Sequence, residues 1–208
     1  MARIKVPRKS TAIDMTAMCD VAFLLLTFFI LTAKPRTDDP VPIDVPRSSI
    51  QVPVPDENFA TITVGHNKAF FGIEGTDLRK ETLEQVGAIY KQTFTPEELK
   101  KFSGIESFGV PIANMHQFLS LSSEQQRQFA QPGIPRDSVS NELFNWIREA
   151  RKATASLHNV QMRIAIKGDS KEEYPVIKDV IGILQKQKLN KFSLITSVSG
   201  GGPAPKSK

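Results

Sequence analysis

The chain has 208 residues, of which 40% are apolar and 24% charged, with a formal net charge of +5. These are the proportions of ordinary globular material, enough for one domain of usual size or a smaller one with additions. The positive charge is concentrated near the two ends, at Arg3, Lys5, Arg8, Lys9, Lys206 and Lys208. The bulk of the chain is therefore nearly neutral. No basic face with interleaved aromatic residues is present, so a nucleic-acid partner is not expected.

The first predicted element is an apolar helix near the N-terminus. Residues 21–33 carry no charge. The apolar stretch extends back to residue 12 if two acids within it, Asp14 and Asp20, are accepted. Three interpretations compete: a cleaved signal peptide, a core helix capped by Asp20, and a transmembrane helix over residues 12–33. A signal peptide would need a small residue where Leu31 stands, and a core helix would need a polar face that residues 23–31 lack. The sequence favours the transmembrane helix.

Basic residues around this helix predict its orientation. Four Lys or Arg residues precede the helix within residues 1–11, whereas Lys34 and Arg36 are the basic residues just after it. Positive residues are enriched on the cytoplasmic side of a span. We therefore expect a cytoplasmic N-terminus at residues 1–11 and a C-terminal region outside, in the periplasm if the cell has two membranes.

Asp20 is the unusual residue of the predicted span. An ionised aspartate within a helix that crosses lipid costs roughly 2.5–3.5 kcal/mol on insertion scales, and the side chain avoids that cost by taking up a proton. Thr16 and Thr27 lie four residues before and seven residues after Asp20, so the three share a helix face. This polar stripe is expected to face a protein partner or water. Asp14 is closer to the interface, where we expect it to cap the helix or contact headgroups. The single cysteine, Cys19, is interpreted as small apolar filler.

The stretch IDMTAMCDVAFLLLTFFILTA (residues 13–33) resembles, without a gap, the membrane segment of the ExbD/TolR family of biopolymer-transport proteins. The matching positions are Ile13, Thr16, Asp20, Leu25, Leu26, Phe29, Thr32 and Ala33. Asp14 stands where the family usually has Asn, and Ala17 where it usually has Pro, so the helix is expected to start differently. The resemblance places Asp20 at the family's proton-carrying acid.

Two further stretches extend the resemblance to about half of the chain. VPIDVPRSS (residues 41–49) is similar to the proline-containing stretch that follows the family's membrane helix. Residues 162–196 resemble the family's strand, helix, strand ending, with Asp169 and Tyr174 at familiar spacing. From its residues alone, Asp169 is more simply interpreted as a turn residue.

Residues 34–58 contain six prolines and predict an extended tether between the membrane and a folded domain over residues 59–198. Strand-like composition predicts a hairpin from residues 59–64 and 68–73. Residues 76–90 then predict a helix with Leu83, Val86 and Tyr90 on one face. The prediction as a whole is an α+β fold: an N-terminal transmembrane helix, a proline-rich tether, and a small domain whose sheet is covered by helices on one face.

Residues 91–139 are predicted to form a helical insertion in that domain. Thr95 and Ser122 each begin a capping-box pattern, so a helix should start after each of them. The insertion either binds a partner or merely packs, and the sequence leaves both open.

The remaining elements follow from periodicity. A helix over residues 140–157 places Leu143, Ile147, Ala150, Thr154 and Leu157 on one stripe, with Trp146 expected at its edge. A strand over residues 160–168 turns Met162, Ile164 and Ile166 inward. A helix over residues 172–188 is expected to bury Val176, Val180 and Ile183 or Leu184, and residues 191–198 form the last strand. The tail at residues 199–208 is predicted to be disordered.

Catalytic chemistry is not expected. His66, His116 and His158 are scattered along the chain with no second ligand at metal spacing, and no phosphate loop, nucleophile elbow or dinucleotide fingerprint occurs. The sequence therefore predicts neither an enzyme nor a cofactor, and the resemblance implies that protons are the coupling ion.

The resemblance implies a proton-driven subunit of an inner-membrane complex. Two copies of the chain would sit in a ring of polytopic ExbB/TolQ-like subunits, Asp20 would carry protons, with Thr27 and Thr16 as supporting hydroxyls, and a TonB-like partner would energise outer-membrane transport. TolR-like envelope maintenance and a gliding or secretion motor are variants of this hypothesis. A membrane-tethered protein that binds peptidoglycan or envelope proteins without proton flux is the alternative.

Overall fold

The computed structural model describes residues 15–33, 47–48, 57–137, 140–168, 174–195 and 197–198. The chain divides into two compact units, residues 1–38 and residues 39–208. The described element of the first unit is α1 (Met15–Thr32), which lies within the range predicted to span the membrane. Asp14, Asp169, most of the proline-rich tether, the side chain of Tyr174 and the tail lie outside the described residues.

The second unit is built on a five-stranded sheet with the order β4-β3-β2-β5-β6. Its strands are β2 (Phe59–Gly65), β3 (Lys68–Ile73), β4 (Ser107–Phe108), β5 (Arg163–Gly168) and β6 (Ser193–Ile195). β2 pairs antiparallel with β3 and parallel with β5, while β6 pairs parallel with β5. A separate parallel pair joins β1 (Arg47–Ser48) to β7 (Ser197–Val198). The last predicted strand is therefore divided between two sheets.

The predicted hairpin is present and its turn explains its register. His66 and Asn67 connect β2 to β3, and both have positive φ angles, 53° and 61°. A two-residue turn with both residues in the left-handed region matches the twist of an antiparallel pair. Gly65 is thereby paired with Lys68, and Ile62 lies opposite Phe71.

One face of the sheet is covered by helices α2 (Thr76–Ile89), α6 (Glu142–His158) and α7 (Tyr174–Lys186). Because strand residues alternate between faces, Ile62, Phe71 and Ile166 point the same way. They join a single apolar core with Leu83 of α2, Ile147 of α6 and Val180 of α7, among others. The α+β fold expected from the sequence is confirmed.

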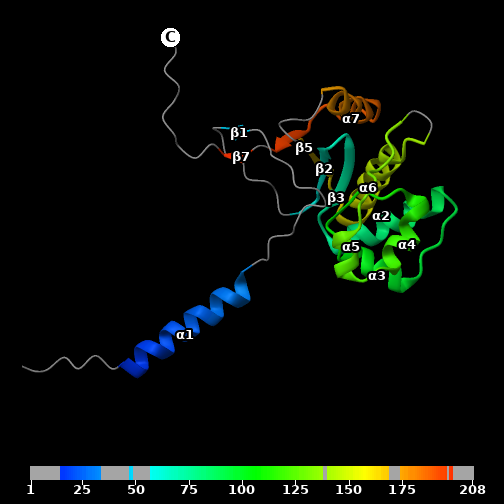
Figure 1. Cartoon of the computed structure of the whole chain (residues 1–208). Coiled ribbons are helices and arrows are strands. Elements are labelled where there is room, and N and C mark those ends of the chain that lie inside the picture. The colour runs from blue at the N-terminus through cyan, green and yellow to red at the C-terminus, as the bar shows by residue number, and fades with distance from the viewer. Residues whose placement is uncertain are drawn as a thin grey trace, which may run out of the picture. The chain divides into compact units, whose positions relative to one another are not determined.

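The insertion is helical, as predicted, but it also supplies an edge strand. It contains α3 (Pro96–Ser103), β4, the 3-10 turn η1 (Ile112–Asn114), α4 (Met115–Ser120) and α5 (Ser123–Gln128). Thr95 and Ser122 form the two expected capping boxes at the starts of α3 and α5. The two-residue β4 was not predicted, because so short a strand leaves no alternation in the sequence. Figure 1 shows α3, α4 and α5 grouped beside α2, on the opposite side of the domain from α7.

Two predictions about α6 were wrong. Trp146 was expected at the edge of the buried stripe, but it is fully buried, with its ring 6.0 Å from that of Phe102 in α3 and 4.7 Å from that of Phe108 in β4. Leu157 was expected on the buried stripe, but it is 49% exposed. The insertion explains Trp146, since its aromatic residues cover a part of α6 that would otherwise face solvent. Leu157 lies in the last turn, where α6 extends past the core.

Candidate functional site

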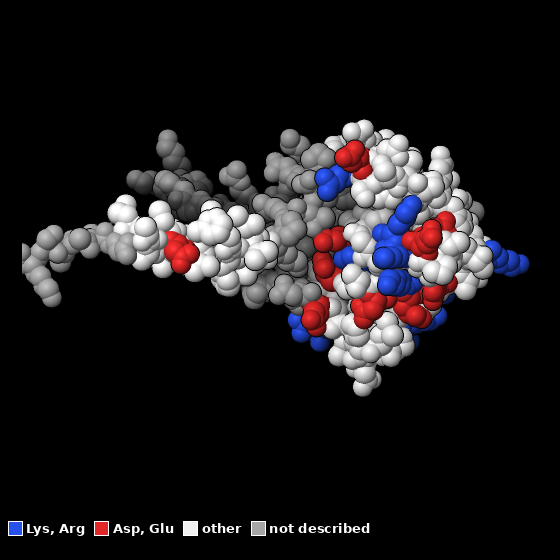
Figure 2. All heavy atoms as spheres, turned by 90° about the horizontal axis from the view of Figure 1, so that it is seen from below, with Lys and Arg blue, Asp and Glu red and all other residues white. Residues whose placement is uncertain are grey.

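Helix α1 carries one ionisable acid in an otherwise apolar surface. Its 18 residues contain no Lys, Arg, His or Glu, and the one acid is Asp20. At 1.5 Å per residue the helix is about 27 Å long, close to the thickness of a bilayer's hydrocarbon core. α1 is the one helix of the described residues that is long and apolar enough to cross a membrane. Figure 2 shows it as a white cylinder with a single red group.

Two hydroxyl groups of α1 are bonded to its own backbone. Thr27 Oγ1 donates to the carbonyl oxygen of Leu24 at 2.9 Å, and Thr32 Oγ1 donates to that of Phe28 at 2.8 Å. Such bonds satisfy the hydroxyl donor without a partner helix and leave oxygen lone pairs available as acceptors. Seven residues of helix place Thr27 about 10 Å along the axis from Asp20 and within about 20° of its direction. Thr16, four residues towards the N-terminus, lies about 40° from Asp20 in the same sense of rotation as Thr27.

This arrangement can hold and release a proton. A protonated Asp20 donates one hydrogen bond, and the ionised form accepts several, so the preferred partners change with its charge. None of the α1 side chains is buried. Intramembrane acids in this setting mark ion pathways and proton relays.

Histidines of the second unit form pairs that sequence reasoning missed. His116 Nδ1 lies 2.8 Å from Glu98 Oε1, and His158 Nε2 lies 2.9 Å from Asp77 Oδ2. The partners are 18 and 81 residues apart in sequence, so spacing gives no sign of them. Within the described part of the chain, no three His, Cys, Asp or Glu side chains gather closely enough to hold a metal ion.

A shallow cavity of about 480 Å³ lies between the β2–β3 turn, the end of the insertion and α7. Its charged lining residues include Lys68, Arg136 and Asp179. Both cations already have partners: Lys68 Nζ donates to the carbonyl oxygen of Gln131 at 2.9 Å, and Arg136 donates to the carbonyl and side-chain oxygens of Asn67 at 2.9 and 2.8 Å. These bonds tie the end of the insertion to the hairpin.

Two buried charged side chains anchor the insertion to the domain. Arg79 of α2 donates to the carbonyl oxygens of Ile73 at 2.6 Å and Ser103 at 2.7 Å. Glu142 of α6 accepts the amide N–H of Ile112 at 2.8 Å, and burial raises the pKa of its carboxyl group. The contacts of Arg79 with Ser103 and of Glu142 with Ile112 span 24 and 30 residues, and neither follows from local sequence. The insertion is therefore an integral part of the domain.

The extramembrane unit shows no dominant charge on the face seen in Figure 2, where Lys and Arg side chains alternate with Asp and Glu. An apolar helix long enough to cross a bilayer, with one acid within it and an α+β domain after it, defines a single-pass membrane protein whose span carries a titratable group. The model of the family described as biopolymer transport protein ExbD/TolR matches residues 7–199. The chain belongs to the ExbD/TolR family.

No curated protein and no solved structure matches the chain. The match spans nearly the whole chain and extends beyond the helix and the C-terminal elements that first suggested the family. ExbD/TolR proteins are energy-transducing proteins of biopolymer transport. They work in membrane complexes with polytopic subunits of the ExbB/TolQ kind, and they are not enzymes.

Proposed function

We propose that this chain is the proton-carrying subunit of an inner-membrane motor of the ExbB–ExbD–TonB type, in which the proton motive force energises transport across the outer membrane. The observation that supports this best is Asp20, the one acid on an apolar helix of membrane-spanning length. Family membership supports the class of machine. The alternatives within that class are TolR-like envelope maintenance and a gliding or secretion motor.

In the proposed mechanism, Asp20 takes up a proton from the periplasmic side and releases it to the cytoplasm. Each proton that crosses a potential of 100 mV supplies about 2.3 kcal/mol. Ionised Asp20 holds to a polar patch on the surrounding ring, and neutral Asp20 passes an apolar stretch. Alternation of the two states turns the helices relative to the ring. Thr16, about one turn from Asp20, supplies an oxygen atom that accepts a hydrogen bond from the protonated acid or from water, and Thr27, about 10 Å along the axis, supplies one that accepts from water on the same face.

The proposed assembly follows from the same features. The N-terminus lies in the cytoplasm, two copies of the chain insert α1 into a ring of ExbB/TolQ-like subunits, and residues 59–198 act in the periplasm on a TonB-like partner. An exposed apolar helix that carries an acid is unfavourable in lipid alone, and a ring that encloses it removes that penalty. The coupling ion is the proton, and no other cofactor is proposed.

The test compares three variants in a strain that lacks the native gene: Asp20→Asn, Asp20→Glu and, as a matched control one residue away, Cys19→Ser. Energised uptake and proton flux through the purified complex in liposomes are measured, together with recovery of the ring subunit. Asp20→Asn should abolish both activities while the ring subunit still co-purifies. Asp20→Glu should keep part of the flux, and Cys19→Ser should keep most of it.

A normal proton flux in Asp20→Asn would overturn the proposal. If no form of the complex conducts protons while the periplasmic domain retains envelope proteins or peptidoglycan, the chain is instead a membrane-tethered binding protein. Loss of the ring subunit in Asp20→Asn alone would make the acid an assembly contact.

A further inference from the structure

The imidazole ring of His158 lies between two side chains that come from other segments of the domain. His158 is the last residue of α6. Its Nε2 atom lies 2.9 Å from Oδ2 of Asp77, in the first turn of α2, and its Nδ1 atom contacts the side-chain oxygen of Asn58. Asn58 directly precedes β2. The contacts therefore join the ends of two helices to the point at which the chain from the membrane enters the domain.

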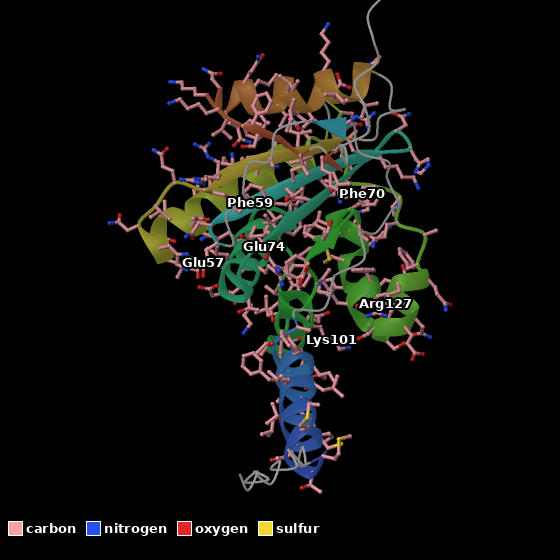
Figure 3. All side chains as sticks on the ribbon, turned by 90° about the vertical axis from the view of Figure 1, so that its left-hand side faces the viewer. Glu57, Phe59, Phe70, Glu74, Lys101 and Arg127 are labelled. Atoms are coloured by element: carbon pink, nitrogen blue, oxygen red, sulfur yellow. The ribbon has the colours of Figure 1, made fainter. Side chains whose placement is uncertain are left out.

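The backbone holds Asn58 at this point. Its φ angle of 56° turns the chain into β2, and its carbonyl oxygen accepts the N–H of Arg163 at 2.9 Å. The next carbonyl, that of Phe59, accepts the N–H of Glu74 at 2.9 Å. Figure 3 shows Glu57, Phe59 and Glu74 together at this end of the sheet. Asn58 is thereby fixed where the chain enters the five-stranded sheet.

The contacts of His158 depend on its charge. A doubly protonated ring donates from both nitrogens and forms an ion pair with Asp77, whereas a neutral ring has one N–H to share between two oxygen acceptors. The C-terminal end of a helix also favours a positive charge, and His158 occupies that end of α6. The hydrogen bond from His158 lowers the pKa of Asp77, so the acid stays ionised at mildly acidic pH.

Other charged groups belong to the elements that meet at this point. Glu57 adjoins Asn58, and Arg163 begins β5 opposite Phe59. Glu74 lies 3.8 Å from Arg79 of α2 and is engaged there. Among the described residues, Asp77 is the acid within ion-pair distance of the ring.

We propose that His158, Asp77 and Asn58 form a proton-sensitive latch, the entry latch, which closes when His158 is protonated. Its ligand is the proton, the ion that the proposed motor consumes, and acidification on this side of the membrane would fasten the tether's entry to α2 and α6. The proposal concerns the folded domain alone. It stands whether or not Asp20 conducts protons.

The sign of the effect follows from the two charges. Protonation of His158 supplies the ion pair with Asp77 and the second hydrogen-bond donor, so the stabilisation accompanies the gain of that proton and is lost with it. It persists under further acidification until Asp77 takes up a proton, and the pKa of Asp77 is lowered by its hydrogen bond with His158. The entry latch is therefore closed while the ring is charged and open while it is neutral.

The first test uses the full chain in detergent, with thermal unfolding followed by the fluorescence of Trp146, its one tryptophan. Wild type, His158→Gln, Asp77→Asn and the double variant are compared at pH 8 and pH 5.5. The difference in Tm between wild type and His158→Gln should increase by roughly 2–4 °C in favour of wild type when the pH is lowered from 8 to 5.5. In the Asp77→Asn background, the protein with His158 should show no such gain over the double variant. An equal difference at both pH values would overturn the proposal.

A matched control is His66→Asn, because His66 lies in the hairpin turn at a φ of 53° that asparagine adopts readily. The Tm of this variant should depend on pH in the same way as that of wild type. The His116–Glu98 pair is present in all of these proteins, so its contribution cancels in the comparison. A His66→Asn protein that loses the gain would assign the effect to another site.

The second test measures hydrogen exchange at the entry itself, which a purely structural role of His158 would leave independent of pH. The amides of Arg163 and Glu74, which donate to the carbonyl oxygens of Asn58 and Phe59, should exchange about tenfold more slowly in wild type than in His158→Gln at pH 5.5, after correction for intrinsic rates, and equally at pH 8. Asn58→Gly keeps the positive φ and removes one acceptor, so it should lose this protection even if His158→Gln does not fold. Wild-type protection in Asn58→Gly would refute the entry latch.

Discussion

The carboxylate of Glu142 lies 2.8 Å from the amide nitrogen of Ile112, thirty residues earlier in the chain. Glu142 begins α6 and Ile112 begins η1, so this bond fastens the insertion to the helix that follows it. Both residues are buried. A buried N–H without an acceptor is costly, which makes the bond important for keeping the insertion in place.

Replacement of Glu142 separates its acceptor role from its charge. Glu142→Ala leaves the Ile112 N–H unpaired and should lower the free energy of unfolding by about 1–3 kcal/mol. Glu142→Gln keeps a side-chain oxygen in place and should unfold within about 1 kcal/mol of wild type at pH 7. Urea unfolding followed by Trp146 fluorescence measures both. If Glu142→Gln lowers the free energy of unfolding as much as Glu142→Ala does, the charge of the carboxylate is needed.

The raised pKa of Glu142 also predicts a pH dependence. Burial raises the pKa of the folded-state carboxyl, so the folded protein binds a proton before the unfolded chain does. This group therefore adds stability as the pH falls from its raised pKa towards the ordinary value. Wild type should gain stability relative to Glu142→Gln between pH 7 and pH 4. A constant difference over that interval would contradict the assigned cause.

Arg79 should be sensitive to replacement by either an apolar or another basic residue. Arg79→Met leaves the carbonyl oxygens of Ile73 and Ser103 without their donor and should cost about 2–4 kcal/mol of unfolding free energy. Arg79→Lys keeps the charge, but a single ammonium group does not reproduce the fork that reaches both oxygens, so it should recover only part of the loss. Arg127→Met, at an exposed position in the last turn of α5, is the control and should cost much less.

Local sequence signals predicted most of the second unit because its elements carry them strongly. The hairpin has a two-residue turn, α3 and α5 have capping boxes, and β5 alternates inward and outward residues. What could not be predicted depends on distant partners. Trp146 is buried by Phe102 and Phe108, and β4 is a strand because Phe108 pairs with Phe71. No local period carries that information.

Gly109 is predicted to tolerate no side chain. A Cβ atom at this position would lie 2.2 Å from the ring of Phe70, in a fully buried part of the sheet edge. Gly109→Ala should therefore lower the free energy of unfolding by about 1–3 kcal/mol through overpacking, and the Tm should fall with it. Gly182→Ala in α7 is the control, because nothing lies within 4 Å of its Cβ and alanine favours helices. Rescue of Gly109→Ala by Phe70→Leu would identify the clash, and an unchanged Tm in Gly109→Ala would refute it.

Thr27 provides a separate test of the proposed proton path. Thr27→Ser keeps a hydroxyl and Thr27→Val keeps the shape without it. If the oxygen supports proton transfer by Asp20, Thr27→Val should reduce proton flux through the reconstituted complex several-fold, a cost of about 1 kcal/mol or more, while Thr27→Ser stays close to wild type. Thr32→Val is the control, since its hydroxyl bond to Phe28 is of the same kind. Equal losses at positions 27 and 32 would indicate a helix effect.

The candidate site was more accessible to sequence reasoning than the histidine pairs. An acid stands out in an apolar run because every neighbour lacks charge, and helical spacing gives the direction of Thr16 and Thr27 from Asp20. The contacts of His158 with Asp77 and Asn58 span 81 and 100 residues. They depend on the fold that joins the ends of α2 and α6, which no short stretch of sequence encodes.

The parallel pairing of β2 with β5 has a consequence for how the domain forms. Ala60 is opposite Ile164, so the two strands at the centre of the sheet are separated by about a hundred residues that include the entire insertion. Closure of so long a loop slows folding. The hairpin of β2 and β3 can form early, but the edge of β2 that pairs with β5 stays unpaired until β5 is in place. During synthesis, the nascent chain is then at risk of aggregation until β5 is made. Chaperones that shield strand edges should matter most in that interval.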